Sequence, residues 1–128
     1  MTPDHETLVH QKKVVRLQPP HRLDLMGGVG LQRQIAAIEP EQGSLWLIDM
    51  AHVEFIDSAG RLALVKTLSL AQANHCRLLI CNLPASIRII FELTQLDQVF
   101  ELVDSSTALA GVGLSFSEPP QTAAPIAA

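Results

Sequence analysis

The spacing of hydrophobic residues changes along the chain, and its short apolar stretches predict strands. Residues 45–50 and 77–81 are apolar at almost every position, which is typical of strands covered on both faces of a sheet. Residues 14–17 and 99–103 are further apolar stretches of strand length. Residues 8–9 predict one more strand, which a polar turn would pair antiparallel with residues 14–17.

Longer stretches carry their apolar residues at helical spacing. In residues 26–38 the apolar side chains lie three and four positions apart and form one face. Residues 58–74 predict a second helix. Residues 84–96 predict a third, which begins with a proline, as the first turn of a helix allows. A short helix over residues 106–110 would follow the last strand.

The order of these elements predicts the fold class. Strand, helix, strand, helix and strand follow one another between residues 45 and 103, which favours parallel strands with right-handed crossovers. We therefore predict an α/β fold: a small mixed, mostly parallel β-sheet flanked by about four α-helices. The 128 residues fit a single domain over residues 7–112, between a flexible N-terminus (1–6) and a flexible Pro/Ala-rich tail (113–128).

Composition narrows the possible functions. The net charge is −4 and no run of basic residues occurs, so we expect no direct nucleic-acid ligand. The apolar stretches are too short to cross a bilayer, and the polar start does not resemble a signal peptide. We therefore expect a cytoplasmic protein without membrane insertion. Cys76 and Cys81 would point to diverging faces of one strand and remain buried, free thiols.

The sequence predicts neither a metal site nor a cofactor. The five histidines are dispersed, and none is paired with another ligand at metal-binding spacing. The glycine-rich run at residues 27–30 lacks the third glycine of a dinucleotide-binding fingerprint and the Lys-Ser/Thr of a phosphate-binding loop. We expect this run to be a flexible entry into the first helix.

Ser58 has the most informative local context, because it follows a buried strand and opens a helix. The simplest interpretation is a helix N-cap, a position that serine favours. A nucleophile assisted by His52 and Asp49 or Asp57 is a second interpretation, although the spacing does not bring these groups together. The third is a phosphoacceptor. A helix N-terminus tolerates a phosphate, yet the added charge beside Asp57 would repel a docked partner.

The helix that follows Ser58 has no clean polar side. Leu64, Leu68 and Ala71 can face the sheet. Leu62, Leu70 and Ala73 then lie toward the other side. Such an apolar patch beside Ser58 is either a docking surface or the contact face of a neighbouring helix. The sequence favours neither.

The run Asp57-Ser58-Ala59-Gly60, between an apolar strand and an apolar helix, resembles the signature loop of STAS domains. More narrowly, it resembles that of bacterial anti-sigma factor antagonists. Other pieces fall in the same order as in the family: the strand at 14–17, the pair Leu23-Asp24, the strand at 77–82, and Arg88 in the third helix. The resemblance covers about residues 6–112 and implies the fold predicted above.

The resemblance also implies a function. Antagonists of this type bind an anti-sigma factor, often a serine protein kinase, while the loop serine is unphosphorylated, and a PP2C-type phosphatase reverses its phosphorylation. Carried over, Ser58 is the phosphorylation site. The expected partner-binding residues are Asp24, Asp57, Ser58, Ala59, Gly60, Arg61 and Leu62. We expect no enzyme activity, no catalytic residue, and a monomer or weak homodimer.

Two departures from the family pattern concern the partner. Extra residues at 19–22 precede Leu23-Asp24, and Arg61 stands where an aliphatic residue is usual. Arg61 would either pair with a phosphate on Ser58 or change which partner docks. The alternative function is a non-switching scaffold or accessory subunit of the same fold, such as a stressosome component or part of a lipid-transport ABC complex.

Overall fold

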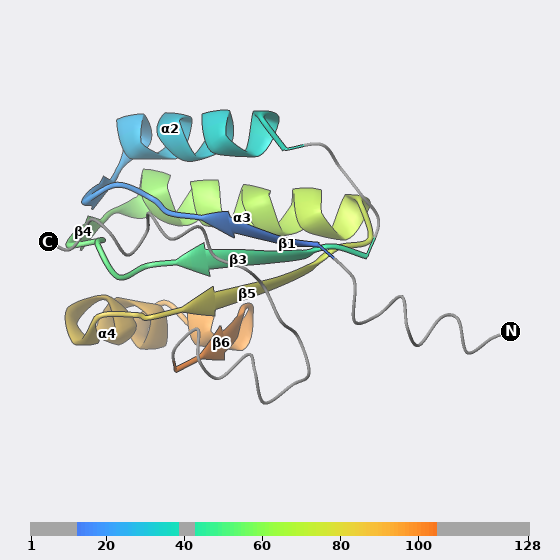
Figure 1. Cartoon of the computed structure of the whole chain (residues 1–128). Coiled ribbons are helices and arrows are strands. Elements are labelled where there is room, and N and C mark those ends of the chain that lie inside the picture. The colour runs from blue at the N-terminus through green and yellow to red at the C-terminus, as the bar shows by residue number, and fades with distance from the viewer. Residues whose placement is uncertain (1–12, 39–42, 105–128) are drawn as a thin grey trace, which may run out of the picture.

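The computed structural model describes residues 13–38 and 43–104, and its main sheet has helices packed against it (Figure 1). The strand order is β1-β3-β5-β6, and every neighbouring pair is parallel. The bounds are Val14–Leu17 for β1, Leu45–Asp49 for β3, Arg77–Cys81 for β5 and Glu101–Val103 for β6. The parallel arrangement expected after residue 45 is confirmed.

Three α-helices occur in this described part: α2 (Leu25–Ala36), α3 (Ser58–Ala73) and α4 (Ala85–Leu93). Each coincides with a predicted helical stretch. The last ends earlier than predicted because Gln95 adopts a left-handed conformation, with φ of 62°, and a short 3-10 helix η1 (Leu96–Gln98) follows. The strand at residues 8–9 and the helix at 106–110 lie outside the described residues.

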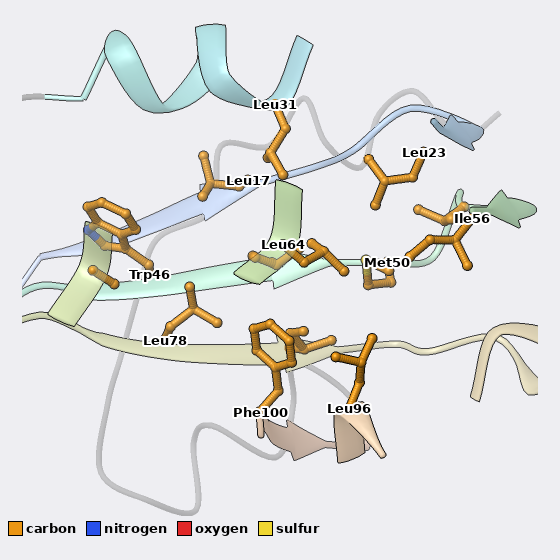
Figure 2. Close-up of a cluster of buried hydrophobic side chains, with 14 of the residues drawn as sticks. Leu17, Leu23, Leu31, Trp46, Met50, Ile56, Leu64, Leu78, Leu96 and Phe100 are labelled. Carbon is orange, nitrogen blue, oxygen red and sulfur yellow. The ribbon is translucent and has the colours of Figure 1, made fainter. Parts of the chain in front are cut away.

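The main hydrophobic core lies between the helices and one face of the sheet (Figure 2). Trp46 of β3 and Leu78 of β5 point into it from the sheet, where they meet Leu31 of α2, Leu64 of α3 and Phe91 of α4. These five side chains are at most 4% exposed. Burying an aliphatic side chain of this size stabilises the fold by about 1.5–3 kcal/mol.

The other face of the sheet carries a smaller apolar cluster that includes Leu47, Leu79 and Cys81. β3 is buried at every position, as predicted for a strand covered on both sides. Cys81 belongs to this cluster and Cys76 to the main core, so the two thiols lie on opposite faces. Both cysteines are buried and no disulfide joins them, which confirms the prediction that they do not bridge.

A second, two-stranded sheet was absent from the sequence-based prediction. β2 (Arg22–Leu23) and β4 (Phe55–Ile56) pair in parallel. Each leads directly into a helix through an aspartate, Asp24 for α2 and Asp57 for α3. Both aspartates have extended backbones, with φ of −115° and −120°, and each accepts a hydrogen bond from a glycine N–H three residues later. The two loops are therefore built alike and lie side by side.

Those two glycines lie in close contact with the backbone of β2. A Cβ on Gly27 would lie 2.1 Å from the carbonyl oxygen of Arg22, and one on Gly60 would lie 1.7 Å from that of Leu23. Gly28 is also buried, and a Cβ there would lie 2.9 Å from the Cβ of Ala63 in α3. The prediction of a flexible entry at residues 27–30 is wrong, because these residues lie inside α2, where Gly27 permits close contact with β2 and Gly28 with α3.

A polar network joins the carboxyl ends of β1, β3 and β5. Asp49 is 2% exposed and accepts hydrogen bonds from Arg16, from Asn82 Nδ2 at 2.9 Å and from the Ala51 N–H at 3.0 Å. Gln18 Nε2 adds a longer contact of 3.3 Å. Burial acts to raise the pKa of Asp49, but the hydrogen bonds and the charge of Arg16 outweigh it and hold the pKa below its usual value.

Asp49→Asn is expected to lower the free energy of unfolding near neutral pH by about 2 kcal/mol, because it removes the charge from these hydrogen bonds. Since the folded-state pKa is lowered, the carboxylate stabilises the protein above the ordinary pKa of aspartate. That stabilisation disappears as the pH falls through the lower folded value. Urea unfolding across acid and neutral pH should show the wild type and the variant converge in acid. A difference independent of pH would contradict this account.

Candidate functional site

Ser58 is the first residue of α3, and its side chain is exposed. The N-cap of α3 is Asp57, whose carboxylate accepts a hydrogen bond from the Gly60 N–H at 3.0 Å. The interpretation of Ser58 as the cap is therefore wrong. The Ser58 hydroxyl forms no hydrogen bond with any residue of 13–38 and 43–104. The side chain projects from a helix start that is already capped.

The geometry gives the nucleophile interpretation no support. Asp49 is held in the network at the strand ends, and Asp57 caps α3. The His52 ring lies beside that of His21, with 6.2 Å between centroids. Among the described residues, no hydrogen bond connects any of these side chains to Ser58. As the spacing indicated, these groups do not form a triad with Ser58.

The loop that carries Asp24 lies next to the Ser58 loop because β2 pairs with β4. The N–H of Asp57 also donates to the carbonyl of Leu23 at 3.4 Å. A hydrogen bond from the Gly27 N–H lowers the pKa of Asp24, and the neighbouring Arg22 adds to this effect. Asp24 therefore lies near the candidate phosphorylation site as an ionised helix cap.

The seven expected partner-binding residues differ in accessibility. Ser58 and Leu62 are exposed, with 54% of Leu62 accessible. Gly60 is buried, so its role is to let the loop pack closely and it presents no surface to a partner. The others are half-buried: Asp24, Asp57, Ala59 and Arg61.

The apolar patch on α3 is exposed, as its interpretation as a docking surface requires. Leu62 and Leu70 are 54% and 39% accessible, whereas Leu64 and Ala71 are fully buried, which confirms the predicted faces. α2 packs along α3 in the described structure, yet it leaves Leu62 and Leu70 accessible. The neighbouring-helix interpretation therefore does not account for these two residues.

Sequence reasoning missed the contribution of α2 and β4 to this surface. Leu25 and Met26 are 69% and 73% exposed, and Val29 is 39% exposed. Phe55 lies nearby, with the Arg22 guanidinium 4.1 Å above its ring centroid. The available signal was that positions 25, 26 and 29 fall off the buried stripe of their helix.

A model of the STAS domain family matches residues 10–110 of the chain. The chain belongs to the STAS domain family. A solved structure of a sulfate transporter family protein from Wolinella succinogenes is similar to it, with a TM-score of 0.58 and 17% identity. The similarity covers 77% of this chain and 82% of the chain in that structure. At this identity the likeness shows the fold alone, and it confirms the α/β prediction.

Membership of the STAS family supports a regulatory binding module that acts through contacts with other proteins. Across the described ranges of this STAS domain, no helix is both long and apolar enough to cross a membrane. Nor do the side chains of those ranges include a cluster of three or more residues suited to holding a metal ion.

Proposed function

We propose that this STAS domain is an antagonist of an anti-sigma factor. It binds that partner, a serine protein kinase, while Ser58 is unphosphorylated, and it releases the partner when Ser58 carries a phosphate. A PP2C-type phosphatase restores the binding form. The exposed Ser58 side chain carries the proposal, because Asp57 performs the capping and leaves the serine free of a structural role.

The proposal requires that a phosphate change binding more than folding. At a helix N-terminus, a negative charge stabilises the helix by about 0.3–1 kcal/mol, so the fold tolerates it. At a docked surface, a like charge facing a partner costs several kcal/mol. A phosphate on Ser58 therefore changes the free energy of binding more than the free energy of folding. Arg61, three residues after Ser58, lies on the same side of α3 and within reach of such a phosphate.

A pull-down with wild type, Ser58→Ala and Ser58→Asp tests the proposal, with mass spectrometry of the captured proteins and of Ser58 itself. We expect wild type and Ser58→Ala to capture a serine protein kinase that Ser58→Asp does not retain. Ser86→Asp is the matched control, because Ser86 is also exposed in the first turn of a helix, α4. Equal capture by wild type and Ser58→Asp would instead favour the non-switching scaffold.

A further inference from the structure

Two hollows with mostly apolar linings lie along the seam between α2 and α3, and we refer to the surface of this seam as the groove. The two helices pack against each other and begin at the same end of the molecule (Figure 1). Toward their N-terminal ends, the groove opens into a hollow of about 160 Å³ lined by Leu25 and Val29 of α2 and by Leu62 and Lys66 of α3. An apolar cavity of about 150 Å³ holds a benzene-sized group, so this hollow fits one Leu or Phe side chain.

A second hollow lies further along the same seam. It has a volume of about 300 Å³ and is lined by residues that include Ile35 and Ala36 of α2 and Leu70 of α3. Leu62 and Leu70 are separated by about 12 Å along the axis of α3, at 1.5 Å per residue. Two side chains seven or eight residues apart on an incoming helix would match that separation.

The two helices that form the groove carry only basic charged residues, on a chain that is acidic as a whole. α2 and α3 contain no acidic residue, and their charged side chains are Arg33, Arg61 and Lys66. The net charge of the chain is nevertheless −4. Lys66 lines the first hollow itself, whereas the carboxylates of Asp24 and Asp57 lie at the helix starts, where each accepts a hydrogen bond from a glycine N–H. The positive charge along the helices beyond these caps indicates an occupant that is both apolar and acidic.

An unsatisfied donor marks the first hollow. The side-chain nitrogen Nε2 of Gln32 is buried and has no hydrogen-bond partner among the described residues, and Gln32 lines this hollow. A buried donor without an acceptor carries a cost in free energy. An acceptor on an incoming chain would remove that cost if the Gln32 side chain turned toward it.

We propose that this groove binds an acidic amphipathic helix of the partner protein. Two apolar side chains of that helix, seven or eight residues apart, fill the two hollows, and its carboxylates face Lys66 and the neighbouring arginines. This inference rests on the proposed function, because it describes the partner that docks beside Ser58. It also explains the switch, since a phosphate on Ser58 would repel an acidic helix.

An anionic membrane surface is the competing occupant, and the geometry favours a protein. A bilayer is a broad, adaptable surface without groups at a fixed spacing that would match two separate hollows. A helix presents its side chains at fixed spacing and can place one in each hollow. The two helices carry three cations in all, fewer than the clusters of four to eight typical of binding to anionic lipids.

The test uses the full chain and two designed helical peptides of about 18 residues, roughly 27 Å long. Both carry leucines at anchor positions seven apart, and they differ only in having Glu or Lys at the polar positions. We expect the acidic peptide to bind wild type about tenfold more tightly than the basic one. Leu62→Glu should weaken it about tenfold, and Lys66→Glu should reverse the preference between peptides. Leu93→Glu, the same substitution at an exposed leucine on α4, should leave binding unchanged.

Three outcomes would overturn the inference: no binding of the acidic peptide, equal effects of Leu62→Glu and Leu93→Glu, or recruitment of wild type to phosphatidylglycerol vesicles in place of the peptide. A further arm separates the inference from the proposed switch. If Ser58→Asp binds the acidic peptide as well as wild type does, the groove stands and the switch fails. If Leu62→Glu retains the captured kinase that Ser58→Asp loses, the switch stands and the groove fails.

Discussion

Ser58→Asp is expected to weaken binding of the captured kinase roughly a hundredfold or more, which corresponds to about 2.8 kcal/mol. The side chain is exposed at the start of α3, and the neighbouring Asp57 carboxylate is already engaged by the Gly60 N–H. A new carboxylate there adds to the local negative charge and faces the partner. Titration calorimetry with the purified kinase measures the loss.

The fold of Ser58→Asp should remain intact, because Asp57 still caps α3. Far-UV circular dichroism and the urea midpoint should match those of the wild type. Ser86→Asp, which adds the same charge to the first turn of α4, should keep full affinity. Unfolding of Ser58→Asp would show that the serine has a structural role after all, and the switch would lose its physical basis.

Gly60→Ala is expected to lower the free energy of unfolding by about 3 kcal/mol or more. The added methyl group would lie 1.7 Å from the carbonyl oxygen of Leu23, and both groups belong to the backbone or are fixed to it. Relief requires α3 and β2 to move apart, which breaks the contact between the two loops. Urea unfolding of the purified variant measures the effect.

Gly30→Ala is the matched control for that substitution. A Cβ on Gly30 meets nothing within 4 Å, and the position lies inside α2. Alanine should therefore stabilise this helix by up to about 1 kcal/mol. If Gly60→Ala and Gly30→Ala are equally stable, the close approach at β2 does not constrain the site as described.

Long periodic segments could be predicted from the sequence because their burial repeats over several turns or along a whole strand. β3 and β5 each contain four consecutive apolar residues, and the buried stripes of α2 and α3 follow helical spacing. The short strands β2 and β4 contain two residues each and carry no periodic signal. Their pairing depends on segments far apart in the chain.

The choice of N-cap shows the same limit at the site. Asp57 and Ser58 are adjacent residues of types that both favour the cap position, so local preference cannot separate them. Pairing of β4 with β2 extends the backbone through Asp57, and the helix then begins at Ser58. A contact distant in sequence thus decides which of the two side chains is left exposed.

The groove between α2 and α3 also could not be predicted from the sequence pattern. The apolar residues of α2 outside its buried stripe, Leu25 and Val29, become informative only once α3 is placed beside them. The contact at Gly28 and Ala63 sets that placement, and it leaves a hollow that no single helix contains.

The most direct measurement is the affinity of the purified kinase for two forms of the same wild-type protein. One form carries a single phosphate on Ser58, verified by mass spectrometry, and the other has been treated with a PP2C-type phosphatase. We expect the unphosphorylated form to bind at least about a hundredfold more tightly, with the same circular dichroism spectrum for both. Equal affinities for the two forms would contradict the central claim that charge at Ser58 controls docking.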